Sequence, residues 1–370
     1  RLLAVVMAGG LLLRYTSNRQ RLRALMYLVV GIGVASALFG IVRQVIRPND
    51  LAITLHIPTV GAVALMYPHP DMGYGQFTNR NHFAFLMEMA FGLALGLAAG
   101  GRGHRGRQLL SLAAAAFVWT ALVFTTSRGA VFSMLGQLLF AALLLGAVRS
   151  PSRVQKQRES TPGRWRRAGT SLITRAALVS CLMIVAAISV VWVGGDPLVG
   201  RLESLSKELN TGGSAEQRGR SRAEIWNATW QLIKANPVAG AGFGAYQTAI
   251  PRYHDSSGKW TPQQAHNDYL ELLASGGVIG AVLVAWVIFA FVRQARAPLR
   301  ASDPFRRAAC FGALTGLFAV VLHSLVDFGL HITINALICT ALVVIATING
   351  RVEKKRSPGR HSASSTPFVA

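Results

Sequence analysis

Long apolar stretches make up most of the chain, and shorter polar and basic segments separate them. A run of roughly 17–25 apolar residues is long enough to cross a bilayer as an α-helix. The pattern therefore predicts an all-α fold, a polytopic transmembrane helix bundle. About nine spans are expected, the first of them partial because its apolar run is short, at residues 2–13, 24–42, 83–100, 109–127, 129–148, 172–194, 271–292, 308–325 and 331–349.

One further apolar stretch, Leu51–Tyr67, is expected to be a re-entrant or interfacial segment and not a span. It contains Pro58, and proline breaks or kinks the interior of a helix. Counting this stretch as a span would also move every later basic segment to the opposite side of the membrane. The remaining spans give a consistent threading without it.

Composition narrows the class of protein. Hydrophobic residues form 52% of the chain and charged residues only 14%, whereas a soluble domain carries roughly 25% charged residues. An ordinary water-soluble enzyme is therefore excluded. The formal net charge is +23, but the basic residues are divided among segments between apolar runs and do not share one soluble face. No nucleic-acid partner is expected.

The distribution of Lys and Arg predicts the orientation of the helices, because cytoplasmic segments are enriched in these residues. Most of them lie in alternate connecting segments, at 14–23, 101–108, 149–171, 293–307 and 350–370. Placing these segments in the cytoplasm divides the chain into N-terminal transmembrane helices at 1–194, a periplasmic loop at 195–267, C-terminal transmembrane helices at 268–349 and a basic cytoplasmic tail at 350–370.

The most informative motif is the string from Gln263 to Gly280, which enters a predicted span. If the whole string is helical, a histidine and two glycines share one face with two leucines, namely His266, Leu270, Leu273, Gly277 and Gly280. Gly276 and Gly280 also form a small-xxx-small pair that allows another helix to approach closely. An imidazole at the mouth of a span can accept a proton near neutral pH. The alternative is a histidine that only caps an interfacial helix.

Several arginines lie on the predicted periplasmic side. A guanidinium stays charged and binds phosphate oxygens with two parallel hydrogen bonds. At the membrane interface such side chains suit a lipid diphosphate whose tail lies in the bilayer; the candidates are Arg222, Arg128, Arg220, Arg218 and Arg80. The alternative for each is neutralisation of a nearby acid or of an anionic lipid headgroup. The glycine-rich turn after Pro237 is weak support for phosphate binding, because no clear helix follows it.

Ionisable side chains within or beside spans suggest function by default, and here they are Glu88, His323, Asp327 and His331. For Asp327 and His331, at helix ends, a structural or pairing role is an equal alternative. His266 with Asp268, and His254 with Asp255, lack both the i,i+4 spacing and an obvious third ligand of a metal site. No metal and no other cofactor is expected.

These motifs together resemble the bacterial O-antigen ligase and polymerase superfamily of integral membrane glycosyltransferases. The ligase pattern of a histidine, a small polar residue and two spaced glycines is matched without a gap by His266, Asn267, Gly277 and Gly280. Further matching features are Thr78 to His82, the turn at Ser127 to Gly129, the stretch from Arg222 to Gly242, and the run from His323 to Phe328.

The resemblance implies that a glycan is transferred from undecaprenyl diphosphate to an acceptor hydroxyl, with inversion and without a metal. It also implies a multi-pass protein of the bacterial inner membrane, with membrane lipids around it and an active site facing the periplasm. His266 would be the general base, and Asn267 and Asp268 would orient its ring. Arg222 and Arg128 match the arginines of the family and would bind the diphosphate, with Arg80, Arg218 and Arg220 as weaker candidates.

The acceptor that the ligase resemblance implies is the lipid A-core oligosaccharide. An O-antigen or exopolysaccharide polymerase remains an alternative, because it shares the histidine string, and a protein O-oligosaccharyltransferase is a further one. A small-anion transporter is a more distant alternative. It would require broken helices at the midplane and inverted repeats, and the sequence contains no evident repeat.

Overall fold

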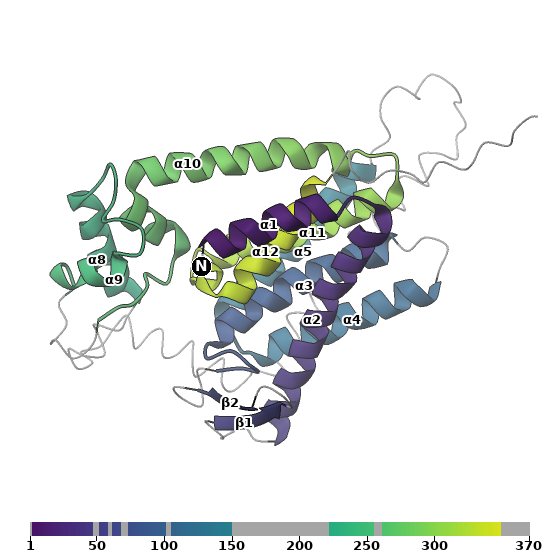
Figure 1. Ribbon diagram of the computed structural model, residues 1–370, viewed down its shortest axis with the longest axis horizontal. Helices are drawn as coiled ribbons and strands as arrows, with labels where there is room; N and C mark the ends of the chain where they lie inside the picture. The colour runs from purple at the N-terminus through teal and green to yellow at the C-terminus, as the bar shows by residue number, and fades with distance from the viewer. Residues whose placement is uncertain are drawn as a thin grey trace, which may run out of the picture.

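The structure is a computed structural model that describes residues 2–46, 52–57, 61–67, 73–100, 105–149, 222–254 and 261–348. Within these ranges it is a bundle of long helices, with one β-hairpin and one group of short helices attached to its periphery (Figure 1). In chain order the elements are α1 (Leu2–Tyr15), α2 (Arg19–Ile46), β1 (Ala52–Ile57), β2 (Gly61–Met66), α3 (Arg80–Gly100), α4 (Arg105–Phe124), α5 (Arg128–Arg149), α8 (Arg222–Ala235), α9 (Tyr246–Ala249), η2 (Ile250–Arg252), α10 (Asp268–Leu299), α11 (Pro304–His323), η3 (Gly329–His331) and α12 (Thr333–Thr347).

Six of the described helices are long and apolar enough to cross a membrane, namely α2, α3, α4, α5, α10 and α11. Each coincides with a span predicted from the sequence, so the prediction of a polytopic membrane protein is confirmed to that extent. The helices α1 and α12 are apolar but shorter, with 14 and 15 residues. The predicted span at 172–194 and the tail at 350–370 lie outside the described residues.

Helix α3 forms the centre of the bundle. Its side chains are buried without interruption from His82 to Ala94, because α2, α4, α5, α11 and α12 all pack against it. An almost entirely apolar sequence at these positions makes such complete burial favourable. The beginning of α3 is therefore held in a fixed place by its neighbours, and this end carries several of the polar side chains considered below.

Helices α3 and α11 run antiparallel and approach each other most closely at glycines. A Cβ atom on Gly92 would lie 2.4 Å from the amide nitrogen of Gly316, and one on Gly312 would lie 2.8 Å from the carbonyl oxygen of Gly92. Small residues allow two helix backbones to pack at this distance. The antiparallel pairing places the start of α3 beside the end of α11.

The segment that contains Pro58 forms an antiparallel β-hairpin, which is an exception to the predicted all-α fold. Strands β1 and β2 pair over their whole length, from Ala52 opposite Met66 to Ile57 opposite Gly61. Residues with β-branched side chains, which favour strands over helices, are frequent in this stretch. The hairpin is attached to α2 through Arg43, whose guanidinium lies 3.5 Å from the centre of the Tyr67 ring.

The short helices α8, α9 and η2 form a group beside the N-terminal end of α10 (Figure 1). Helix α8 begins at Arg222. Its apolar face, including Ala228 and Leu232, packs with Tyr246, Ile250 and Ala274 into a second, smaller hydrophobic core. This core joins the group to the first turns of α10.

Candidate active site

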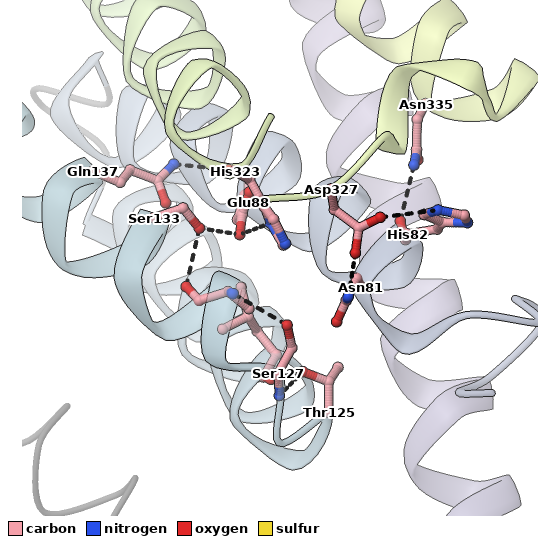
Figure 2. Close-up of polar contacts among 12 residues, drawn as sticks. Asn81, His82, Glu88, Thr125, Ser127, Ser133, Gln137, His323, Asp327 and Asn335 are labelled. Atoms are coloured by element: carbon pink, nitrogen blue, oxygen red, sulfur yellow. Dashed lines mark hydrogen bonds and ion pairs between the residues drawn. The ribbon is translucent and has the colours of Figure 1, made fainter. Parts of the chain in front are cut away.

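The turn between α11 and η3 carries the carboxylate on which most polar contacts of the site converge. Asp327 in this turn is fully buried. Asn81, in the first turn of α3, donates a hydrogen bond from Nδ2 to Asp327 Oδ2, and Nε2 of His82 lies 3.7 Å from Asp327 Oδ1. Figure 2 shows both side chains reaching the carboxylate from α3. The close pairing of α3 with α11 therefore produces this half of the site.

Two residues from distant parts of the chain reach the same carboxylate. The Nη2 atom of Arg222, the first residue of α8, lies 3.4 Å from Asp327 Oδ2. The Nδ1 atom of His266 lies 3.5 Å from Asp327 Oδ1. Asp327 therefore connects the start of α3, the start of α8 and the segment before α10.

The surroundings of Asp327 keep it charged. Burial alone would raise the pKa of its carboxyl group, but the adjacent His266 and His82 rings hold the pKa well below its usual value. The carboxylate is thus ionised at neutral pH, and it stabilises positive charge on the groups around it.

His266 lies at the surface of the site, where its ring is partly covered. Its side chain is 31% exposed, while its Nδ1 atom is buried. The exposed part of the ring is therefore the side away from Asp327. The ring also packs edge-on against Phe328, with ring centres 4.8 Å apart, and His82 packs against the same phenyl ring at 4.6 Å.

The structure corrects the prediction that His266 shares a helix face with the glycines. Helix α10 begins only at Asp268, and His266 has a φ angle of 50°, in the left-handed region. Asn267 is the N-cap, and its side-chain oxygen accepts hydrogen bonds from the amides of Tyr269 and Leu270. Because Asn267 caps the helix directly after His266, the helix begins at Asp268 and the histidine side chain turns toward Asp327. The helical spacing of the residues in this string did not indicate that start.

The two neighbours of His266 that were predicted to orient its ring contact other groups. The Nδ2 atom of Asn267 donates to the carbonyl of Leu325, at 2.8 Å, and Asp268 accepts a hydrogen bond from the Ser324 hydroxyl, at 2.7 Å. Both contacts fix the start of α10 to the turn that carries Asp327. The carboxylate nearest to the His266 ring is therefore Asp327 and not Asp268.

The helical backbone of α10 is interrupted at Gly277, whose φ angle is 58°. The amides of Val278 and Ile279 donate to the carbonyls of Pro237 and Val238 instead of to their own helix. In return, the freed carbonyls of Ala274 and Ser275 accept hydrogen bonds from the amides of residues 241 and 242. These four backbone groups of α10 thus have partners in the segment from Pro237 to Gly242, as buried backbone requires.

The exchange of hydrogen bonds between α10 and the glycine-rich turn explains why glycine is needed at positions 277 and 240. It also corrects the prediction that the glycines of α10 face another helix. A Cβ atom on Gly277 would lie 2.4 Å from the carbonyl oxygen of Val238, and one on Gly240 would lie 2.4 Å from the carbonyl carbon of Ser275. Gly280 is less constrained, since its Cβ would meet the Phe243 ring at 3.6 Å. The glycine-rich turn therefore packs on α10 and couples Arg222, through α8, to the helix that follows His266.

The described arginines of the predicted set lie around the same end of the bundle. Arg222 is 45% exposed, so its guanidinium contacts Asp327 and still reaches solvent. Arg80 precedes Asn81 and donates to the Thr126 hydroxyl, at 3.3 Å. Arg128 is exposed at the start of α5, where the adjacent Gly129 packs against His323 and Val326. Arg218 and Arg220 lie outside the described residues.

Comparison with known proteins relates the chain to a known family. Residues 113–285 match the family model described as O-antigen ligase. This match supports the resemblance to the O-antigen ligase superfamily. No match is found among curated proteins. The match supports a membrane glycosyltransferase of the ligase or polymerase type, and lipid-linked glycans as its general class of substrate.

The match to the O-antigen ligase family covers only part of the candidate site. Arg128, Arg222 and His266 lie within residues 113–285, whereas Asp327 and the α3 residues that bind it lie outside. Sequence reasoning singled out Asp327 as an ionisable residue near a helix end, but left its role open. It did not identify His82 or Phe328 as parts of the site, because only the packing of α3 against α11 brings them to His266.

Among the described residues, no group of three His, Cys, Asp or Glu side chains is arranged to hold a metal ion. The site consists instead of one buried carboxylate, a partly exposed imidazole and a guanidinium. Such a set can take up a proton at the imidazole and bind a phosphate oxygen at the guanidinium.

Proposed function

We propose that the protein transfers a glycan from undecaprenyl diphosphate to an acceptor hydroxyl at the periplasmic face of the inner membrane, in the manner of an O-antigen ligase. The acceptor in this proposal is the lipid A-core oligosaccharide. The observation that carries it is the convergence of His266 and Arg222 on the buried carboxylate of Asp327. It brings a proton acceptor and a phosphate-binding group within reach of one substrate.

The proton step uses the two nitrogens of His266 differently. With Nδ1 directed toward Asp327, the neutral ring carries its proton on that atom, and Nε2 is free to accept another. The acceptor hydroxyl gives its proton to Nε2 while its oxygen attacks the anomeric carbon. Asp327 then stabilises the imidazolium that forms.

The bond that breaks joins the anomeric carbon to the diphosphate. Its electron pair leaves with the diphosphate oxygen, so negative charge grows where the arginines lie. Cationic groups placed at developing charge lower the barrier, which is the role we assign to Arg222 and Arg128, with Arg80 as a further contributor. Attack from the side opposite the leaving group inverts the configuration of the anomeric carbon, and the step proceeds without a metal.

The orientation in the membrane is part of the proposal. The basic segments place residues 149–171 and 350–370 in the cytoplasm and the loop at 195–267 in the periplasm. Labelling of single cysteines with an impermeant reagent from the periplasmic side should modify a probe at Ser214 and leave one at Ser152 unmodified. The reverse labelling would place the site on the wrong side for a periplasmic transferase.

The activity can be tested with the purified full chain in proteoliposomes. We expect glycan transfer from a synthetic undecaprenyl-diphosphate donor to lipid A-core, with release of undecaprenyl diphosphate and inversion at the new linkage. If glycan is added only to another donor glycan, the protein is a polymerase. A chain that binds the donor and transfers to neither acceptor would contradict the proposal.

A complementary test uses lipopolysaccharide from a strain that lacks the gene. Loss of a ligase leaves bare core together with unattached polymer, whereas loss of a polymerase leaves core capped with a single repeat. The two banding patterns distinguish the proposed function from its main alternative without purification.

A further inference from the structure

A second carboxylate–histidine pair lies inside the bundle, where the proposed reaction does not use it. Glu88 of α3 and His323 of α11 are both fully buried, and Oε1 of Glu88 lies 2.8 Å from Nδ1 of His323. Ser133 of α5 donates to the same carboxylate oxygen, as Figure 2 shows. The His323 ring also stacks on Phe85, with ring centres 4.2 Å apart.

Stability alone does not explain this pair. Removing charged groups from water costs several kcal/mol, and well-packed apolar residues often stabilise a core at least as well. Moreover, Oε2 of Glu88 and Nε2 of His323 are buried without a hydrogen-bond partner among the described residues. Buried polar groups of this kind point to a role other than stability.

His323 is joined to the proposed site through the backbone. Its carbonyl accepts hydrogen bonds from the amides of Val326 and Asp327, at 3.0 and 3.1 Å. Its side chain is fixed to α3 at Glu88, and the Asp327 side chain is fixed to the same helix at Asn81. Helix α3 therefore holds both ends of the turn at residues 323–327.

The same turn also holds the segment that follows His266. The carbonyl of Ser324 accepts a hydrogen bond from the Asp268 amide, at 3.0 Å, and the carbonyl of Leu325 accepts one from the Asn267 side chain. A displacement of the turn would consequently move both Asp327 and the start of α10. The relative position of His266 and Asp327 depends on it.

We propose that Glu88 and His323 are positioning residues of the transfer site, which act by fixing the turn at residues 323–327. Neither side chain touches substrate. Their effect is on the alignment of Asp327 with Nδ1 of His266, and this inference rests on the proposed function. A displacement of a catalytic group by about 1 Å lowers the rate of the chemical step strongly. We expect it to weaken substrate binding less.

The test compares Glu88→Gln and His323→Gln with wild type in proteoliposomes, with the undecaprenyl-diphosphate donor and lipid A-core as substrates. Loss of one such buried hydrogen bond should lower kcat about tenfold, while KM for the donor changes little. Thr315→Val is the matched control. Thr315 is equally buried in α11, and among the described residues its hydroxyl bonds only to the carbonyl of Phe311 in its own helix.

The pH profile gives a readout that a loss of stability would not move. A carboxylate beside an imidazole favours its protonated form, so a displaced Asp327 should move the acidic limb of the kcat/KM profile to lower pH. Asp327→Asn should move the limb in the same direction and farther. Thr315→Val should leave it in place.

The outcomes separate this inference from the proposed function. If wild type transfers glycan and Asp327→Asn moves the acidic limb, but both position-88 and position-323 variants behave like Thr315→Val, the positioning role is wrong. If wild type does not transfer glycan, the proposed function itself fails.

A second variant covers the case in which Glu88→Gln does not accumulate in the membrane. Ser133→Ala removes one partner of the carboxylate and should show the same shift of the pH profile, with a two- to threefold lower kcat, equivalent to about 0.5 kcal/mol. An unchanged profile in Ser133→Ala would also count against the inference.

Discussion

Two carboxylate–histidine pairs occupy neighbouring positions in this protein, and their surroundings differ. Glu88 and His323 are completely enclosed by α3, α5 and α11. Asp327 is just as buried, but its partner His266 is 31% exposed and Arg222 contacts its second oxygen. A carboxylate and an imidazole are thus fully buried at Glu88 and His323, whereas at Asp327 and His266 the imidazole is partly exposed to solvent.

The comparison shows that residue type alone does not distinguish a catalytic pair from a structural one. Exposure of the imidazole to substrate and the presence of a neighbouring cation distinguish them. A general base must come within hydrogen-bond reach of the proton that it accepts, and of these two pairs the one at Asp327 presents an exposed imidazole edge. It also lies beside a cation that can bind a leaving group. The enclosed pair lacks both features and is suited to hold backbone in place.

The largest expected effect is at the exposed pair. Replacing His266 with Ala should lower the transfer rate by about 10²–10⁴, which is the usual contribution of general acid–base catalysis, while donor binding largely survives. Initial rates in proteoliposomes, together with donor binding, measure both quantities. His254→Gln, a histidine of the α9 group outside the site, should retain normal turnover.

Asp327→Asn should have the next largest effect. The amide keeps the shape of the side chain but removes the negative charge that stabilises the imidazolium. A hydrogen bond to a charged group contributes about 1.5–3 kcal/mol, which corresponds to a rate about 10- to 100-fold lower. Normal turnover of this variant over the whole pH range would show that the carboxylate has no catalytic importance.

Arg222 should affect binding more than the chemical step. Replacing it with Ala removes a phosphate-binding group, and we expect the Kd for the donor to rise about tenfold, in line with the loss of one charged hydrogen bond. Lys should restore only part of the affinity, since it lacks the planar fork of donors. Arg128→Ala should behave in the same way. Direct binding of labelled donor is the measurement, and equal affinity in both alanine variants and wild type would remove the arginines from the donor site.

The smallest effect on transfer is expected at the kink of α10. Gly277→Ala places a methyl group against the Val238 carbonyl and strains the left-handed backbone, at a cost of about 1–3 kcal/mol. Its thermal unfolding temperature in detergent should fall, with kcat reduced only modestly. Gly280→Ala is the matched control, because its Cβ has room at 3.6 Å. Equal melting temperatures for the two variants would contradict the structural role of the kink.

Much of the fold could be predicted from the sequence, since long apolar runs specify membrane helices directly. The hairpin could not, because a short apolar run with Pro58 fits several structures. His266 was identified from the string that contains it, but its place outside the helix depends on the Asn267 cap. Local patterns record neighbours along the chain, and not contacts between distant segments.

The contact between His266 and Asp327 shows this limit most clearly. Sixty residues of chain separate the two side chains, and their encounter depends on the turn after α11 and on its hydrogen bonds to Asn267 and Asp268. Neither appears as a periodic pattern. The sequence signals for Asp327 were its ionisable side chain near a helix end and its place in the run from His323 to Phe328.

The central claim is that the exposed imidazole of His266 accepts the proton of the acceptor. Chemical rescue tests it most directly, with imidazole added to His266→Ala in proteoliposomes. We expect the added imidazole to restore part of the lost transfer, in proportion to the concentration of its neutral form, and to give no such rescue in His323→Ala, where the ring site is sealed. A His266→Ala protein that transfers glycan at the wild-type rate across roughly pH 6–9, the range around an imidazole pKa, would contradict the account.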